Sequence, residues 1–297
     1  MLIDTCLPPV PHDVLRGPDD VTRVFTGAPE RQWLADQLAG SVAAHEKWHL
    51  PGFCLVCESP QLFAGQTPSG STVESPLLPN YREMLLCPSC QLNNRQRLAA
   101  TTLKTALGRR SRRQTVYLHE QITPMFDWVV RRFGGEHEII GSEFLGPDVE
   151  PGAVVDGVRH EDALALSLGS ESVDAILSTD VLEHVPDIEP ALREAVRVLR
   201  PEGAMIFSIP FHYTETTTVR RAELQPDGSV VHHRSPEFHG NPTRPDEGSL
   251  VFYDYGWDLM DLCKSCGFAD AVGIGAWSLP HGIIGERFQT LFLAVKG

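Results

Sequence analysis

The chain has 297 residues, of which 42% are hydrophobic and 22% charged, and its formal net charge is −14. This apolar content is enough for one sizeable core, or for one core with a small satellite module. The acidic surface repels phosphate backbones and therefore disfavours tight binding to long nucleic acid. No run approaches the roughly 20 apolar residues that span a bilayer, and the N-terminus lacks the pattern of a signal peptide. We expect a cytoplasmic protein with no membrane segment.

The first hundred residues predict two helices on either side of a segment that contains four cysteines. Between residues 30 and 48, apolar side chains recur at helical spacing and form one stripe that includes Trp33 and Val42. Residues 59–80 are rich in proline, glycine and serine, so we expect an irregular loop there. Residues 92–107 have the pattern of a second helix.

The four cysteines form two C-x-x-C pairs, Cys54 with Cys57 and Cys87 with Cys90. Two residues between cysteines let both thiolates reach one ion, and two such pairs complete a tetrahedral shell. A closed shell of four sulfurs has no position for water, so we expect one structural zinc ion. An iron–sulfur cluster would use the same ligands, and unrelated buried thiols would need no ion.

From residue 115 onward, buried strands alternate with helices, which predicts right-handed crossovers and a mostly parallel sheet. The expected strands cover residues 115–120, 137–143, 173–178, 204–210 and 290–296, and the expected helices cover 124–133, 188–199 and 257–266. A third C-x-x-C pair, Cys263 and Cys266, lies on the apolar stripe of the last helix, where core packing explains it. We expect a helical and zinc-binding module over residues 1–110 and an α/β domain over 111–297.

Residues 173–211 resemble the central segment of class I S-adenosylmethionine-dependent methyltransferases of the methyltransferase-11 type. In that family a strand leads into an L-E-H-V-like turn, then a helix that ends in V-L-R-P-x-G, then another strand. Residues 182–185 and 198–203 match the turn and the helix end. The likeness covers roughly residues 115–297 and implies a Rossmann-like fold with S-adenosylmethionine at the carboxyl ends of the strands.

The resemblance also implies roles for acidic residues that follow successive strands. Glu143 stands where the family has the carboxylate that accepts both ribose hydroxyls of the cofactor. Asp162, with Glu161 beside it, resembles the acidic residue near the adenine amino group. Asp180 lies where the family's chain passes the methionine end of the cofactor.

The turn after the first strand of the α/β domain differs from the family's G-x-G-x-G pattern, because residues 118–124 read LHEQITP. The helix that begins there still presents free N–H groups and a positive end. We therefore expect Glu120 near the methionine ammonium and amides near Thr123 facing the methionine carboxylate. A subset of zinc-knuckle methyltransferase-like proteins resembles this chain in the glycine-poor turn and in an Arg-x-Arg motif, here Arg95 and Arg97.

These observations predict a methyltransferase that uses S-adenosylmethionine on the oxygen or nitrogen of a small-molecule acceptor. Methyl transfer is an in-line displacement, so a general base is needed only where the acceptor must lose a proton. The candidates for that base are His212, Tyr213 and His239. Two alternatives stay open: an RNA methyltransferase that grips its substrate with the zinc module and arginines, and a non-methylating cofactor-binding or scaffold protein on the same fold.

Overall fold

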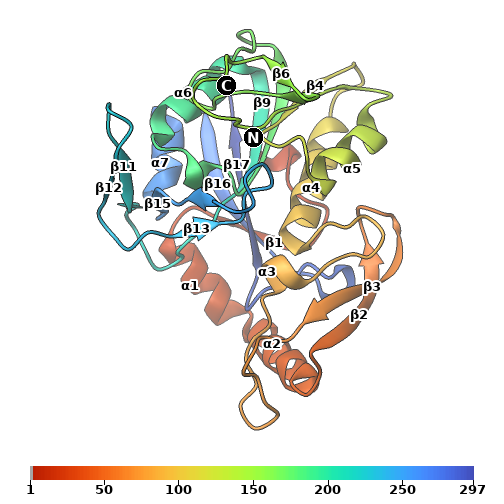
Figure 1. Cartoon of the computed structure of the whole chain (residues 1–297). Coiled ribbons are helices and arrows are strands. Elements are labelled where there is room, and N and C mark those ends of the chain that lie inside the picture. Colours follow the sequence, from red (N-terminus) through yellow and green to blue (C-terminus); the bar gives the residue numbers. More distant parts are fainter. Residues whose placement is uncertain (1–2) are drawn as a thin grey trace.

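The computed structural model describes residues 3–297 and is organised around one seven-stranded sheet with helices on both faces (Figure 1). In spatial order the strands are β1 (His12–Leu15), β16 (Asp270–Ala276), β17 (Gln289–Val295), β9 (Leu199–Ser208), β8 (Val173–Thr179), β4 (Thr115–Leu118) and β5 (Glu138–Gly141). The last four are parallel to one another. Strand β17 runs antiparallel to β9, β16 runs antiparallel to β17, and β1 runs antiparallel to β16. Five of the seven strands therefore run in one direction, as a mostly parallel α/β sheet requires.

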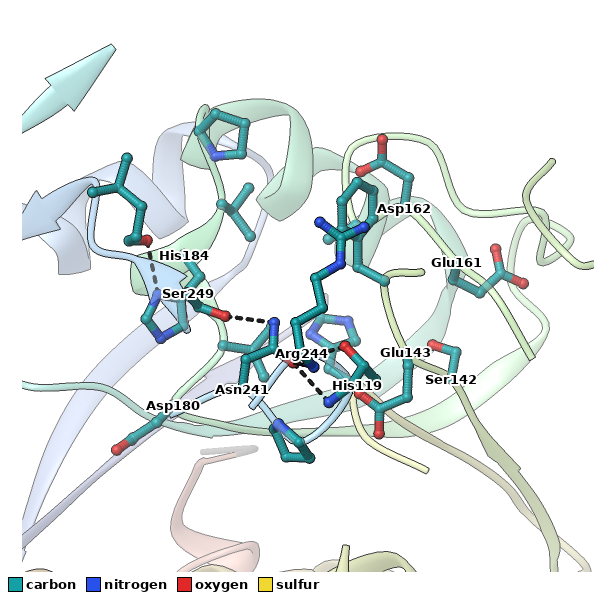
Figure 2. Close-up of a pocket in the computed structure, with 18 of the residues that line it drawn as sticks. His119, Ser142, Glu143, Glu161, Asp162, Asp180, His184, Asn241, Arg244 and Ser249 are labelled. Carbon is teal, nitrogen blue, oxygen red and sulfur yellow. Dashed lines mark hydrogen bonds between the residues drawn. The ribbon is translucent and has the colours of Figure 1, made fainter. Parts of the chain in front are cut away.

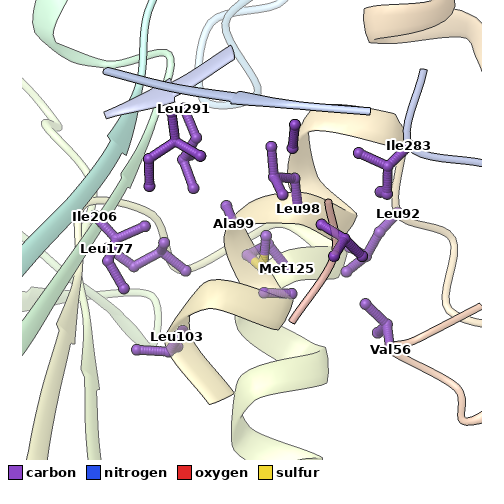
Figure 3. Packing of buried hydrophobic residues seen from close by; sticks show 14 of the residues in the cluster. Val56, Leu92, Leu98, Ala99, Leu103, Met125, Leu177, Ile206, Ile283 and Leu291 are labelled. Carbon is purple, nitrogen blue, oxygen red and sulfur yellow. The ribbon is translucent and has the colours of Figure 1, made fainter. Parts of the chain in front are cut away.

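Side chains alternate between the two faces of the sheet and supply two hydrophobic clusters. Helices α4 (Asn94–Leu107) and α5 (Pro124–Phe133) cover one face, and α1 (Pro18–Gly27), α6 (Ile188–Val198) and α7 (Asp258–Ser265) cover the other. Figure 3 shows Leu177 and Ile206 of the sheet facing Leu98 and Leu103 of α4. All seven residues of β8 are buried, because a central parallel strand is covered on both faces.

The helices of the α/β region begin and end close to the predicted residues. The Thr123 hydroxyl caps α5 by accepting a hydrogen bond from the backbone N–H of Phe126 at 3.3 Å, and Pro124 is the first helical residue. The two strands of the seven-stranded sheet that the sequence did not predict are β1 and β16, which pair with each other at one edge. An added Cβ at Gly275 would lie 3.2 Å from Leu15, so glycine lets these strands pack closely.

The segment between residues 29 and 66 differs from the prediction. The helix expected to reach residue 48 is α2 (Pro29–Val42), and Trp48 lies in a hairpin of β2 (Lys47–Cys54) and β3 (Ser59–Gln66). Trp33, expected in the apolar stripe, is 59% exposed. Strand pairing overrides the helical periodicity here, and the first part of the predicted loop is β3.

The N-terminal part of the chain shares its core with the sheet. Strand β1 belongs to the sheet, and α4 packs across its middle strands. The Arg97 guanidinium donates to the carbonyls of His281 and Gly282 at 2.9 and 2.8 Å and lies 4.1 Å from the ring centre of Phe63. An independent module over residues 1–110 stays a prediction, since these contacts join it to the C-terminal part.

The remaining elements are short and lie in connections. They are η1 (Ile3–Thr5), α3 (Tyr81–Met84), η2 (Leu182–His184), η3 (Leu279–His281), and the paired strands β6 (Val154–Val155) with β7 (Val158–Arg159), β10 (Val219–Arg220) with β15 (Tyr253–Asp254), β11 (Ala222–Leu224) with β12 (Val230–His232), and β13 (Phe238–His239) with β14 (Ser249–Leu250). Among residues 3–297, no helix is both long and apolar enough to cross a membrane.

Candidate functional site

A cavity of about 420 Å³ opens at the carboxyl ends of β4, β5 and β8. This is the edge of an open α/β sheet at which ligands bind. The segment of residues 240–250, which includes β14, covers the cavity from the other side. Figure 2 labels the polar residues of the lining: His119, Ser142, Glu143, Glu161, Asp162, Asp180, His184, Asn241, Arg244 and Ser249.

Glu143 organises the glycine-free turn after β4. Its Oε1 accepts hydrogen bonds from the backbone N–H groups of Gln121 and Ile122 at 2.7 and 3.0 Å. The Gln121 side chain extends the network, because its Oε1 accepts from the Arg159 N–H at 2.8 Å. A carboxylate on the neighbouring strand thus holds the turn, and the same carboxylate lines the cavity.

Glu161 and Asp162 both line the cavity but differ in their partners. Glu161 is 3% exposed and accepts hydrogen bonds from Arg159 Nε, Ser167 N and Ser167 Oγ at 2.6–2.8 Å. Asp162 accepts through Oδ1 from the Leu164 N–H at 2.9 Å. Glu161 therefore builds the wall of the cavity, and Asp162 is the better placed of the two to bind a ligand.

Asp180 sits at the end of β8 with a positive φ of 55° and is surrounded by donors. Its oxygens lie 2.6 and 2.7 Å from the two terminal nitrogens of Arg82 and 3.2 Å from Arg95 Nε. The Ser208 hydroxyl donates to it at 2.8 Å. Burial by itself would raise the pKa of Asp180, but the charges of Arg95 and Arg82 outweigh it and hold the pKa below its ordinary value. Both arginines come from the cysteine-containing part of the chain, which therefore reaches the cavity.

Glu120 and Thr123 do not line the cavity. Glu120 is 5% exposed, and its two oxygens accept from the Thr179 and Thr123 hydroxyls at 2.7 and 2.5 Å. Burial raises the pKa of Glu120 above its ordinary value. These two hydrogen bonds of Glu120 tie the turn after β4 to the end of β8. The expected contacts of Glu120 and Thr123 with the methionine group of the cofactor stay predictions.

The three candidate bases lie in different places. His212 is exposed, with Nε2 3.8 Å from Asp254 Oδ1. Tyr213 is largely buried, its hydroxyl lies 2.8 Å from Thr290 Oγ1, and burial raises its pKa. Neither residue lines the cavity, whereas His239 directly precedes the lining residue Gly240.

Sequence reasoning did not select His119, Asn241 or Arg244, which the structure places in the lining. His119 Nε2 is buried and has no hydrogen-bond partner among the residues that the structure describes, and burial lowers the pKa of this imidazole to about 4, so the ring is neutral at pH 7. Arg244 extends among the labelled side chains in Figure 2, and its Nη2 donates to the Leu145 carbonyl at 3.2 Å. His119 had a usable signal, its place directly after a buried strand. Asn241 and Arg244, which belong to the covering segment, had no such signal in the sequence.

The four cysteines of the first two pairs meet in one cluster. Their sulfur atoms all lie within 4.8 Å of one another, and Cys57 Sγ is 3.7 Å from Cys87 Sγ. The residues after the two pairs, Glu58 and Gln91, have positive φ values of 54° and 61°, so both turns have the same local shape. By contrast, the third pair lies on α7 itself, with Cys263 in the helix and Cys266 at its C-cap, and both are buried in the hydrophobic core.

Comparison with known proteins agrees with this architecture. Residues 140–207 match the methyltransferase domain family. This segment of the chain is therefore similar to a methyltransferase domain. The matched segment runs from the end of β5 through β8 and α6 into β9, and it includes Glu143, Asp162 and Asp180.

Individual relatives match over part of their length. A protein of Mycobacterium sp. (strain KMS) named as an uncharacterized methyltransferase is 31% identical over 140 residues, which are 43% of this chain and 54% of the relative. A ubiquinone biosynthesis O-methyltransferase of Azorhizobium caulinodans is 32% identical over 81 residues, which are 23% of this chain and 32% of the relative. The chain spans about half the length, or less, of these curated relatives.

Solved structures with a similar fold include two methyltransferases. An S-adenosylmethionine-dependent methyltransferase from Mesorhizobium loti is 17% identical, with 62% of this chain and 90% of that chain covered and a TM-score of 0.37. A Burkholderia thailandensis 1,6-didemethyltoxoflavin-N1-methyltransferase is 17% identical, with 68% and 78% covered and a TM-score of 0.37.

Proposed function

We propose that this protein is an S-adenosylmethionine-dependent methyltransferase that binds its cofactor in the strand-end cavity and methylates an oxygen or nitrogen of a small molecule. The observation that carries the proposal is the convergence of Glu143, Asp162 and Asp180 on one cavity, in the segment that matches the methyltransferase domain family. When bound, the cofactor supplies an electrophilic methyl group on a sulfonium.

Each of these carboxylates would act at a different part of the cofactor. Glu143 uses Oε1 for the turn, so Oε2 is the atom that would accept the ribose hydroxyls. Asp162 uses Oδ1 for the Leu164 N–H, so Oδ2 would accept from the adenine amino group. Asp180 is already neutralised by arginines, so its part is to fix the chain beside the methionine end.

The size and cover of the cavity support a small acceptor. A volume of about 420 Å³ falls within the range of small-molecule sites. The hydrogen bond from Arg244 to Leu145 closes the covering segment onto the loop after β5. The net charge of −14 also disfavours a nucleic-acid substrate.

We further propose that the cysteine cluster binds a structural zinc ion. Sulfurs at roughly 2.3 Å from a tetrahedral zinc lie about 3.8 Å apart. The distance of 3.7 Å between Cys57 Sγ and Cys87 Sγ fits this arrangement. The second cysteine pair lies between Arg82 and Arg95, so the ion would fix the two side chains that hold Asp180.

The test is calorimetry with S-adenosylhomocysteine on the wild type and on Glu143→Gln. The amide keeps the oxygen that the turn needs but replaces the other oxygen by an NH₂ group, which cannot accept from the ribose. We expect the Kd to rise roughly 10- to 100-fold, as for the loss of a charged hydrogen-bond partner. Glu150→Gln, an exposed carboxylate outside the cavity lining, is the control and should bind normally. A wild type that binds no cofactor at millimolar concentration would favour the scaffold alternative.

A further inference from the structure

A second group of metal-binding side chains lies at the rim of the cavity. Glu183 and His184 belong to η2, and His239 belongs to β13. One potential ligand atom from each residue lies within 4.8 Å of the other two. The rings of His184 and His239 are nearly perpendicular, at 88°, with their centres 5.0 Å apart.

Glu183 has an unusual environment for a carboxylate. Its side chain is 0% exposed, and among residues 3–297 neither Oε1 nor Oε2 has a hydrogen-bond partner. The nearest side-chain nitrogens are His239 Nδ1 at 3.6 Å and His184 Nε2 at 3.7 Å, which are beyond hydrogen-bonding distance. Burial of an ionised carboxylate without partners is strongly unfavourable, so this group requires either a positive charge beside it or a proton of its own.

The two imidazoles present lone pairs to this carboxylate. His184 Nδ1 lies 2.9 Å from the Leu250 carbonyl, which can only accept, so Nδ1 carries the proton and Nε2 is free. His239 lies between two carboxylates, with Nε2 3.3 Å from Glu237 and Nδ1 3.6 Å from Glu183, so a proton on Nε2 leaves Nδ1 free. Neutral rings in these tautomers turn only acceptor atoms toward Glu183.

We propose that Glu183, His184 and His239 bind a divalent cation of the zinc type at the rim of the cavity. Two nitrogen or oxygen ligands at about 2.0–2.1 Å from a tetrahedral zinc lie roughly 3.4 Å apart, close to the separations of 3.6 and 3.7 Å. Metal-bound histidines usually donate their other N–H to a carbonyl or carboxylate, and the Leu250 carbonyl and the Glu237 carboxylate stand in place to accept from His184 and His239.

Three protein ligands leave a coordination position open, in contrast to the closed shell of the four cysteines. His184 lines the cavity, so the open position faces the space in which the acceptor would lie. If the proposed methyltransferase function holds, an acceptor hydroxyl fits that position, because a bound cation lowers the pKa of an oxygen ligand. The cation site itself does not depend on that function.

A proton is the competing source of positive charge. The Glu183 carboxylate raises the pKa of His239, and a protonated ring would form an ion pair with it. The two explanations differ in one respect: only the metal site has saturable affinity for a divalent ion.

The experiment is a Zn²⁺ titration by calorimetry of protein whose cysteine site is already loaded. We expect one additional ion, giving two per chain by metal analysis. Glu183→Gln and His239→Gln should each weaken the additional site by more than about tenfold, since even the outer partners of metal ligands contribute roughly 10–100-fold. With Co²⁺ in its place, the additional ion should lack thiolate-to-metal charge-transfer absorption.

A matched control is His233→Gln, which removes an imidazole 3.5 Å from the Glu223 carboxylate, both side chains being more than 40% exposed. It should retain both ions. His239 is partly exposed, so its variant should remain folded, which thermal unfolding checks. A wild type with only the cysteine-bound ion, or a His239→Gln variant with unchanged affinity for the additional ion, would overturn the proposal. The readout uses zinc alone, so it is independent of S-adenosylhomocysteine binding.

Discussion

The turn after β8 contains two carboxylates with opposite surroundings. Asp180 lies among donors: Arg82, Arg95 and Ser208 all contact its oxygens. Glu183 is fully buried, and no donor in the described part of the chain lies within hydrogen-bonding distance of its side chain. The comparison shows that burial of a carboxylate does not reveal its role, which depends on whether the protein itself supplies the compensating charge.

The two carboxylates also belong to different parts of the molecule. The arginines at Asp180 come from α3 and α4, on either side of the second cysteine pair. The imidazoles at Glu183 come from η2 itself and from β13, in the segment that leads into the cover of the cavity. Damage to the cysteine cluster should therefore disturb the Asp180 side and spare the Glu183 side.

The largest effect should follow from Cys87→Ser combined with Cys90→Ser. Two of the four thiolates are lost, and with them the zinc and the link between α3 and α4. We expect the free energy of unfolding to fall by roughly 5 kcal/mol or more, since structural zinc sites contribute directly to folding. Metal analysis should show the loss of one ion, while the site at Glu183 still binds zinc in the folded fraction.

Cys263→Ala combined with Cys266→Ala is the control for the cysteine experiment. Both residues lie in the hydrophobic core, so the variant should lose some stability through packing but keep the full zinc content. Retention of all zinc by the Cys87 and Cys90 variant would contradict the assignment of the cluster.

An intermediate effect is expected for Asp180→Asn. The amide keeps the shape of the side chain but leaves Arg82 and Arg95 without their negative partner. We expect the free energy of unfolding, measured by chemical denaturation, to fall by about 2–4 kcal/mol. This is less than for a fully buried ion pair, because these side chains are partly exposed. The pKa of Asp180 is lowered in the folded state, so its contribution is present above its ordinary value of 3.8 and is lost as the pH falls below that value. The variant should therefore show a flatter decline of stability in acid.

Glu189→Gln provides the matched control on the surface. Its carboxylate pairs with Arg193 at 3.3 Å, and both side chains are more than half exposed. Removal of this charge should change stability by less than about 1 kcal/mol. An equal effect at both positions would show that the Asp180 cluster contributes no more than a surface pair.

Local signals explain which parts of the fold the sequence could predict. The buried runs of β8 and β9, the helix start at Thr123-Pro124 and the C-x-x-C spacing each depend on neighbours in sequence. Strand β16 escaped prediction because Gly273 and Gly275 interrupt its apolar pattern, and their purpose is visible only once Leu15 packs against them.

The candidate site was predictable to the same extent. Glu143 and Asp180 follow strands β5 and β8 of the parallel sheet, which brings their carboxyl ends to one edge, whereas Asp162 follows the short strand β7 outside that sheet. The partners of these groups come from distant segments and were not predictable: Arg82 reaches Asp180, and His239 reaches Glu183. His239 was selected as a base candidate from its place in the chain, and that role stays a prediction beside the proposed cation site.

The smallest effect on stability without added metal should come from Glu183→Gln. The sign of that change distinguishes Glu183 from Asp180. Without added metal, the amide removes an uncompensated buried charge and can donate to the imidazole lone pairs, so we expect stability to change by less than about 1 kcal/mol or to increase. With zinc at 100 times the wild-type Kd, the wild type should gain about 2.7 kcal/mol, whereas a variant with at least tenfold weaker affinity should gain no more than about 1.4 kcal/mol. Thermal unfolding with and without zinc measures both quantities, in protein whose cysteine site stays loaded. A large loss of stability without metal would mean that a protonated His239 already pairs with Glu183, and the contrast with Asp180 would then be one of degree.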